Sequence, residues 1–339
     1  MKKFIFRSVL ILVIFYSCYY SIYFSLPFYW ANEGFSTKME YLKKQEKNIN
    51  TVFIGSSRTQ MHIMPSVFDS LTQACDVKSY NLGFGSNSAE EIIHFTEKLL
   101  QGKHSKDLKY IFVEVRPVWY NPENLFTTRG KYILDKTEYS FLTNYYSKTK
   151  YTHAVSDYRK AFIEKTLGIG VIRDVFSYYF NKDKSFLLGE NNDGFVNRRE
   201  AISKDKLNKL LEEQGNDVEK TRKELQKRFQ FATDSYNTLQ SVSDEDSLYV
   251  DRLKKLVSLA NDKGIELYYY PTIRFENTNV PAILNAVDKN GLFLQTSNPK
   301  LYPELYSINY SGDVSHLSLK GAGIYTTILA DLFNQKACQ

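Results

Sequence analysis

Short apolar segments alternate with amphipathic segments along two stretches of the chain, residues 50–117 and 247–335. Strict helical spacing and a capping pair, Ser88 with Glu91 three residues later, indicate that one amphipathic segment of the first stretch is a helix. The β-branched apolar runs indicate buried strands. The first stretch therefore predicts strands at 51–55, 76–82 and 108–115, and helices at 64–73 and 88–101.

The second stretch continues the same alternation toward the C-terminus. It predicts a helix at 247–262, a strand at 265–271, a fifth strand at 291–295 and a closing helix at 318–335. Strand and helix in strict alternation are typical of a parallel sheet with helices on both faces. The predicted fold is therefore an α/β domain with a doubly wound, parallel, five-stranded sheet.

Between residues 118 and 246 the alternation is absent. Residues 140–182 are rich in tyrosine at helical spacing, and residues 201–241 carry dense mixed charge. The second of these segments has an apolar stripe of Leu207, Leu210, Leu211, Val218, Leu225 and Phe229. We predict a helical insertion packed on the sheet, and the alternative is a lid or a docking surface for a membrane partner.

The longest apolar run lies near the N-terminus, at residues 9–30, and no charge occurs between Arg7 and Glu33. A helix of this length spans roughly 33 Å, which is close to the thickness of the hydrocarbon layer. No small-x-small cleavage signal follows the run, so we predict a retained signal anchor, with a cleaved signal peptide as the alternative.

The charges beside this run set its orientation. Lys2, Lys3 and Arg7 lie on its short side, so the positive-inside rule places the N-terminus in the cytoplasm and the rest of the chain outside. A single-pass protein of a bacterial cytoplasmic membrane fits this topology. The predicted organisation is a signal anchor at 1–30, a stalk at 31–50 and an α/β domain at 51–339, with its insertion at 118–246.

Composition excludes several classes of protein. With 43% hydrophobic and 24% charged residues among 339, the chain is neither disordered nor collagen-like. The formal charge of +6 is scattered, whereas nucleic acid binding needs a clustered basic face. Two of the three cysteines, Cys75 and Cys338, lie on the predicted outer side, where they can pair or remain as two buried thiols. Neither cysteines nor histidines have metal-ligand spacing, so we expect no metal and no cofactor.

Three short motifs carry residues capable of chemistry. Gly55–Thr59 follows the first strand, where a serine is exposed at the carboxyl edge of the sheet. Asn81–Ser86 ends the second strand with two glycines, which let backbone N–H groups turn toward a ligand. Asp313 and His316 precede the last helix, three residues apart, so the carboxylate can orient the imidazole. All three motifs fall on one edge of the predicted sheet.

In these three blocks the chain resembles the SGNH (GDSL-like) hydrolase superfamily, whose sheet is flavodoxin-like. The family's G-D-S-L-T block resembles Gly55–Thr59 and makes Ser57 the implied nucleophile. The N-x-G-x-G block matches Asn81, Gly83 and Gly85, which implies that the N–H groups of Gly85 and Ser57 form the oxyanion hole. The D-x-x-H block matches Asp313 and His316, the implied orienting acid and base.

The family's remaining block, G-x-N-D after the third strand, is missing. That strand ends Val113-Glu114-Val115-Arg116, with no asparagine to support the oxyanion. Arg116 is a candidate to supply the missing positive potential, or else forms a salt bridge with Glu114 or a surface acid. Residues 189–193, GENND, repeat the letters inside the insertion, where we expect an ordinary loop. His62 and His94 compete with His316 as bases, and we expect both to be structural.

The membrane-anchored branch of this superfamily modifies cell-envelope polymers, through polysaccharide O-acetylation or D-alanine transfer. The resemblance therefore implies an outward-facing serine acyltransferase or esterase that acts on O-acyl groups of a polysaccharide. The alternative is a catalytically inactive accessory protein that docks a membrane acyltransferase. A third possibility, a binding protein without acyl chemistry, predicts that Ser57, Asp313 and His316 lie far apart.

Overall fold

The computed structural model describes residues 1–45, 49–178, 185–197, 218–237, 241–271, 273–274, 279–288 and 291–338. By its contacts the chain divides into two compact units. The first unit contains Met1–Ser36 and Tyr120–Asp183, and the second contains Thr37–Trp119 and Lys184–Gln339. This division by contacts does not test the predicted organisation into an anchor, a stalk and a domain with an insertion, which stays a prediction.

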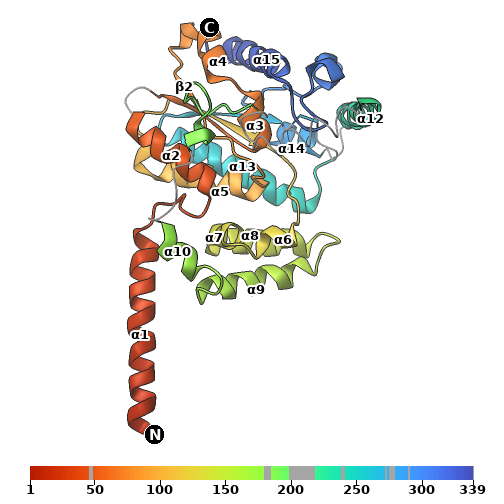
Figure 1. The fold of residues 1–339 in the computed structure, drawn as a ribbon. Coiled ribbons are helices and arrows are strands. Elements are labelled where there is room, and N and C mark those ends of the chain that lie inside the picture. Colours follow the sequence, from red (N-terminus) through yellow and green to blue (C-terminus); the bar gives the residue numbers. More distant parts are fainter. Residues whose placement is uncertain are drawn as a thin grey trace. The chain divides into compact units, whose positions relative to one another are not determined.

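A parallel β-sheet forms the centre of the second unit (Figure 1). Its strands lie in the order β2-β1-β3-β4, and all neighbouring pairs are parallel. The strands are β1 (Thr51–Ile54), β2 (Ser79–Asn81), β3 (Tyr110–Val115) and β4 (Glu266–Pro271). Nearly every strand residue is buried, as expected of a parallel sheet covered on both faces. The predicted parallel α/β fold is confirmed at this level.

The predicted fifth strand at 291–295 is wrong. Among the described residues, this segment makes only one parallel bridge, between Tyr269 and Phe293. Gly291 has a positive φ before the bridge, and Thr296 turns back onto the carbonyl of Leu294 immediately after it. The apolar run is thus too short, between two turns, to extend the ladder beyond one residue pair.

Helices cover both faces of the sheet. One face carries α5 (Ala89–Gln101), whose predicted Ser88–Glu91 capping box is present, and α13 (Asp244–Asn261). The other face carries α3 (Ser57–His62), α4 (Pro65–Leu71) and α15 (Leu319–Ala337). An aromatic core lies between this second helical layer and the sheet, with members Phe53, Phe68, Phe112, Tyr268 and Phe333. The remaining elements of the second unit include η2 (Gln73–Cys75), η3 (Lys103–Ser105), η5 (Ser185–Leu188), α12 (Val218–Asn237), α14 (Val280–Val287), η6 (Pro303–Tyr306) and η7 (Ile308–Tyr310).

A disulfide bond joins Cys75 on η2 to Cys338 at the C-cap of α15, across 263 positions of sequence. Of the two alternatives that the sequence left open, the structure therefore has the bonded pair. Closing so long a loop restricts the unfolded chain, which typically stabilises a fold by about 2–5 kcal/mol. Cys18 is the free cysteine, and it is exposed on α1.

The first unit contains α1 (Lys2–Ser25) and the helices α6 (Pro122–Leu125), α7 (Thr128–Ile133), α8 (Lys136–Ser147), α9 (Ala154–Thr166) and α10 (Ile172–Ser177). Among the described residues, α1 is the one helix long and apolar enough to cross a membrane. α2 (Glu33–Gln45) follows it along the chain. The first part of the predicted leucine stripe, Leu207 to Leu211, lies outside the described residues.

Candidate active site

The first and last of the three motifs meet in the second unit. Ser57 is the first residue of α3, directly after β1, and its neighbour Ser56 is the N-cap. Asp313 and His316 lie in the loop before α15. The Ser57 Oγ is 2.9 Å from Nε2 of His316, and Nδ1 of His316 is 2.9 Å from Oδ2 of Asp313.

The second oxygen of Asp313 shapes the loop that carries the histidine. Oδ1 accepts hydrogen bonds from the backbone N–H groups of Ser315 (2.5 Å) and His316 (2.8 Å). The side chains of His316 and Asp313 are 20% and 21% exposed, so a ligand can reach them from solvent. With Asp313 accepting from Nδ1–H, Nε2 presents its lone pair to the Ser57 hydroxyl, as general base catalysis requires.

Two arginines, Arg274 and Arg228, stabilise the loop that carries Asp313 and His316 through hydrogen bonds. The buried guanidinium of Arg274 donates to the carbonyl oxygens of Asp313 (3.3 Å), His316 (3.2 Å) and Leu305. Arg228, on α12, donates to the carbonyl of Arg274 (2.7 Å) and to the Ser315 hydroxyl (3.2 Å). Burial lowers the pKa of Arg274 to about 10, so it keeps its charge at neutral pH. Neither residue lies in one of the three motifs, and no sequence signal identified them.

The loop that carries Ser57 is held by a buried carboxylate. Glu114, near the end of β3, accepts hydrogen bonds from the N–H of Ser56 (2.6 Å), the Ser56 hydroxyl (3.0 Å) and the Thr59 hydroxyl (2.6 Å). Ser56 is therefore a structural residue, and Ser57 alone of the pair faces His316. A Cβ on Gly55 would lie 1.8 Å from Oγ1 of Thr59, which explains the glycine. The sequence signal for Glu114 was an acid within an otherwise apolar strand.

The middle motif forms the loop after β2. The Asn81 amide donates to the carbonyls of Thr59 (2.7 Å) and Ile63 (2.8 Å), and its oxygen accepts from the N–H of Gly83 (2.8 Å). Asn81 therefore orders this loop against α3. A Cβ on Gly85 would meet open space, so the loop leaves room beside Gly85. Its role in an oxyanion hole stays a prediction.

Lys38, a buried residue of α2, stabilises the loop after β2 through hydrogen bonds to its backbone. Its Nζ donates to the carbonyl oxygens of Asn81 (3.0 Å), Gly83 (2.6 Å) and Gly194 (2.6 Å). Complete burial lowers the pKa of Lys38 to about 7, against the opposing charge of Asp193. This residue lies in the segment that the sequence predicts as a stalk, where nothing marks it as part of a site.

Residues 189–193 form a loop that contacts the end of β2. The carbonyl of Asp193 accepts from the N–H of Asn81 (2.9 Å), and the N–H of Val196 donates to the carbonyl of Gln60 (3.1 Å). The backbone of residues 193–196 is therefore bonded to the end of β2 and to α3. The side chains of Asn191 and Asn192 are exposed, so they do not form part of the hydrogen-bonded Ser57–His316–Asp313 chain.

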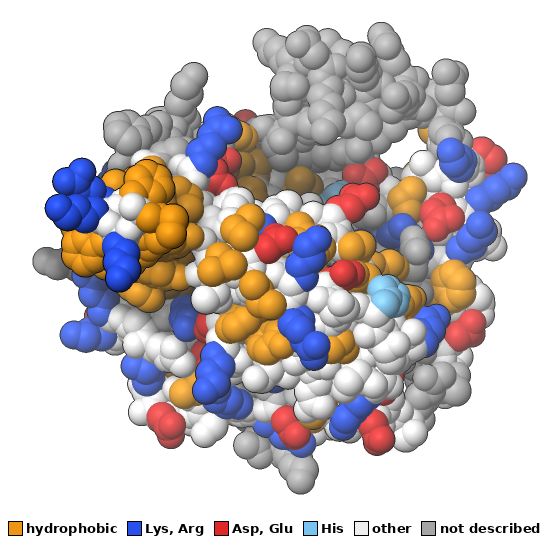
Figure 2. Space-filling view, turned by 90° about the horizontal axis from the view of Figure 1, so that it is seen from below, with side chains coloured by type: hydrophobic (Ala, Val, Ile, Leu, Met, Phe, Trp, Pro, Cys, Tyr) orange, Lys and Arg blue, Asp and Glu red, His pale blue; other side chains and the backbone are white. Residues whose placement is uncertain are grey.

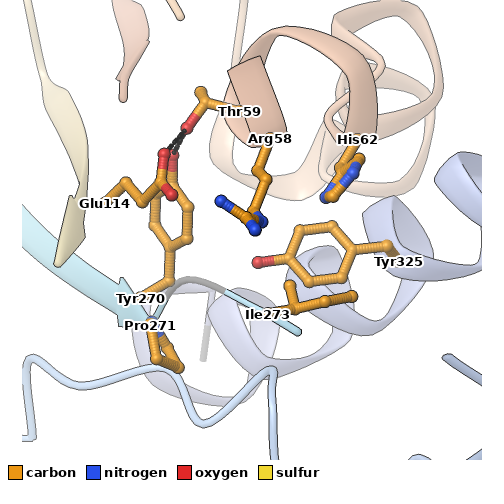
Figure 3. Close-up of a pocket in the computed structure, with 8 residues that line it drawn as sticks. All are labelled: Arg58, Thr59, His62, Glu114, Tyr270, Pro271, Ile273 and Tyr325. Atoms are coloured by element: carbon orange, nitrogen blue, oxygen red, sulfur yellow. Dashed lines mark hydrogen bonds between the residues drawn. The ribbon is translucent and has the colours of Figure 1, made fainter. Parts of the chain in front are cut away.

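Two more arginines, Arg116 and Arg58, lie near the Ser57 loop. Arg116 donates to the carbonyl of Asn87, whose amide donates in turn to the carbonyl of Gly55 (2.8 Å). Figure 3 shows the Arg58 guanidinium directed into a narrow pocket between Tyr270 and Tyr325. Burial lowers the pKa of Arg58 to about 10, and the nearby Glu114 opposes this shift.

The two other candidate bases, His62 and His94, are both buried. Nε2 of His62 accepts a hydrogen bond from the N–H of Leu317 (3.0 Å), and its ring lies 6.1 Å from that of His316. Burial, then the charges of His316, Arg58 and Arg274, lower the pKa of His62 well below 6.5. His62 is therefore neutral in the folded protein. His94 is buried within α5.

The neutral state of His62 predicts sensitivity to acid. Below pH 6.5 the unfolded chain takes up a proton on His62 that the folded protein excludes, so the free energy of unfolding falls as the pH falls. The slope from this one group is at most about 1.4 kcal/mol per pH unit. Urea unfolding between pH 5 and 8 tests this. His62→Gln keeps an acceptor for Leu317, and we expect a flatter profile than in the wild type.

The control is His104→Gln, which removes a histidine on η3, outside the site. We expect it to leave the wild-type slope in place. A His62→Gln profile as steep as that of the wild type contradicts the assignment of a neutral His62.

No protein-family model, curated protein or solved structure matches the chain.

Proposed function

We propose that the protein is an SGNH-type serine acyltransferase or esterase that acts on O-acyl groups of a cell-envelope or secreted polysaccharide. The observation that carries the proposal is the continuous hydrogen-bonded chain from Ser57 through His316 to Asp313, with both links at 2.9 Å. The four-stranded parallel sheet, with Ser57 after the carboxyl end of β1 and with Asp313 and His316 in the loop before α15, supports a flavodoxin-like SGNH fold. The binding-protein alternative expects these three residues to lie far apart, whereas in the structure they are hydrogen-bonded to one another.

The residues support a two-step acyl transfer. The Ser57 oxygen attacks the ester carbonyl carbon while Nε2 of His316 takes the hydroxyl proton, and Asp313 stabilises the imidazolium. The N–H groups of Ser57 and Gly85 stabilise the oxyanion. When the carbon–oxygen bond of the ester breaks, the departing alcohol receives the proton from His316. A sugar hydroxyl or water then attacks the acyl-serine, His316 removes its proton, and that proton returns to Ser57.

Two features support a location at the outer face of a bacterial cytoplasmic membrane. α1 is long and apolar enough to serve as a signal anchor, and Lys2, Lys3 and Arg7 favour a cytoplasmic N-terminus. The Cys75–Cys338 disulfide of the second unit is typical of an oxidising compartment. The anchored protein then faces polymers assembled outside the cell.

A second candidate function is an inactive accessory protein that docks a membrane acyltransferase. The sequence at the end of β3 favours it, because the asparagine of the SGNH block is absent there. Glu114, in the same strand, accepts hydrogen bonds from Ser56 and Thr59 with both of its oxygens. Losing one oxyanion donor typically lowers a rate by about 10²–10³, which weakens catalysis without removing the nucleophile.

A fluorophosphonate probe distinguishes the two functions, because it phosphonylates only an activated serine. We expect the full-length protein in detergent to be labelled on Ser57, as mapped by peptide mass spectrometry, and Ser57→Ala to be unlabelled. Ser70→Ala, which removes an exposed serine on α4, is the control and keeps the label. Absence of label on the folded wild type overturns the enzymatic proposal and favours the accessory protein. Labelling with slow hydrolysis of p-nitrophenyl acetate indicates a transferase.

A further inference from the structure

The corner between α9 and α10 is fixed against the side of α1. The hydroxyl of Tyr16 donates to the carbonyl of Leu167 (3.2 Å), and the hydroxyl of Tyr20 donates to the carbonyl of Thr166. These tyrosines lie five to nine residues before Ser25, where α1 ends. At 1.5 Å per residue, the corner therefore lies about 8–14 Å below the outer end of α1.

Large apolar side chains cover the exposed side of this corner. Ile163, Leu167, Ile169 and Phe176 are between 39% and 51% exposed. Ile163 lies in the last turn of α9, and Leu167, four residues on, is its C-cap. The neighbouring helix α8 differs, because its exposed positions are polar: Lys136, Thr137, Ser140, Asn144 and Ser147. The apolar surface is thus particular to the part of the unit that lies alongside α1.

The charges of the corner favour a negatively charged partner. Arg159, Lys160 and Arg173 are exposed around the apolar side chains. Each acid of the same segment is bound to a neighbour: Asp157 to the Tyr120 hydroxyl, Glu164 to Lys131 and Asp174 to the Thr128 hydroxyl. Figure 2, seen from the N-terminal end of α1, shows hydrophobic and basic side chains on this face, with acidic side chains interspersed.

We propose that the α9–α10 corner, residues 159–176, lies in the interfacial layer of the membrane that α1 crosses. Its apolar side chains enter the boundary between headgroups and acyl chains, and its basic side chains bind anionic lipid phosphates. The outer half of α1 supports this depth, since Tyr16, Tyr20 and Tyr23 are partly exposed there, as expected of an aromatic belt. The inference rests on the membrane anchoring proposed above and is independent of acyl chemistry.

Fluorescence quenching in vesicles tests the depth of the corner. The full-length protein, with Cys18→Ser and the disulfide retained, carries an environment-sensitive fluorophore on Leu167→Cys or Ile169→Cys. Asn144→Cys on α8 is the control. In phosphatidylcholine vesicles containing phosphatidylglycerol, we expect a lipid-attached quencher to act several-fold more strongly at 167 and 169 than at 144. Iodide in the aqueous phase should show the reverse order.

Three results overturn the proposal. The first is iodide access at 167 equal to that at 144, which means that the corner lies in water. The second is protection from both quenchers, which means that a protein, such as a second copy, covers the surface. The third is a fluorophore on the native Cys18 that lipid does not quench, because α1 is then outside the bilayer. Fluorophosphonate labelling of Ser57 in the same vesicles reports separately on the acyl chemistry.

Anionic lipid supplies an independent readout. Replacing Arg159, Lys160 and Arg173 together by glutamine should remove the increase in lipid quenching that phosphatidylglycerol gives at position 167. Quenching that rises equally in the variant and the wild type contradicts the role of these charges.

Discussion

Asp313→Asn is expected to lower the rate at which Ser57 reacts with a fluorophosphonate by about 10³- to 10⁴-fold. The asparagine oxygen can still accept from the N–H groups of Ser315 and His316, so the loop keeps its shape. Its NH₂ group then faces Nδ1 of His316 and donates to it. The imidazole must take the tautomer with hydrogen on Nε2, which cannot remove a proton from Ser57. The measurement is the second-order rate constant for labelling.

A matched control separates this effect from a change in charge. Asp76→Asn removes an acid that pairs with Lys109 at the surface, outside the site, and asparagine tolerates the positive φ there. We expect wild-type labelling from it, and nearly unchanged thermal unfolding from both variants. A labelling rate for Asp313→Asn within tenfold of the wild type would falsify the assignment of Asp313 as the orienting acid.

The sequence pattern identified those elements whose local signal and tertiary role agree. β1, β3, β4 and α5 follow the predicted runs closely because continuous apolar strands and a capped amphipathic helix have few alternatives. The segment at 291–295 has the same apolar character, yet two turns limit it to one bridge. Turns fixed by glycine and by tertiary contacts are invisible to a hydrophobic pattern.

The same division holds within the site. Ser57, Asp313 and His316 stand in short blocks whose spacing carries the chemistry, so sequence could bring them together. Glu114 and Arg274 act on backbone groups of distant loops, and any buried partner of the right charge and reach could do so. Lys38 reaches its three carbonyls from a helix that reads as a polar stalk. Such contacts depend on the three-dimensional arrangement rather than on a motif.

Glu114→Gln is expected to lower the labelling rate of Ser57 by about 10²-fold, through a change in position rather than through loss of a reacting group. The carboxylate accepts from Ser56 at two atoms and from Thr59, so it needs two acceptor oxygens. Glutamine has one such oxygen, which can keep the bonds from the Ser56 N–H and the Thr59 hydroxyl. Its NH₂ group then faces the Ser56 hydroxyl, which loses the acceptor for its own proton while it caps the first turn of α3. The first turn of α3 then shifts, and the Ser57 hydroxyl moves away from His316.

Asp69→Asn is the control that separates a change in the position of Ser57 from a general loss of folding stability. Asp69 likewise accepts from a backbone N–H and a hydroxyl, both of Ser79, but at the opposite end of β2 from the site. Each substitution replaces charge-assisted hydrogen bonds by weaker neutral ones, so we expect both to lower the free energy of unfolding by about 1–3 kcal/mol. Only Glu114→Gln should slow the reaction of Ser57. Equal labelling rates in the two variants would show that Glu114 stabilises the fold without positioning the nucleophile.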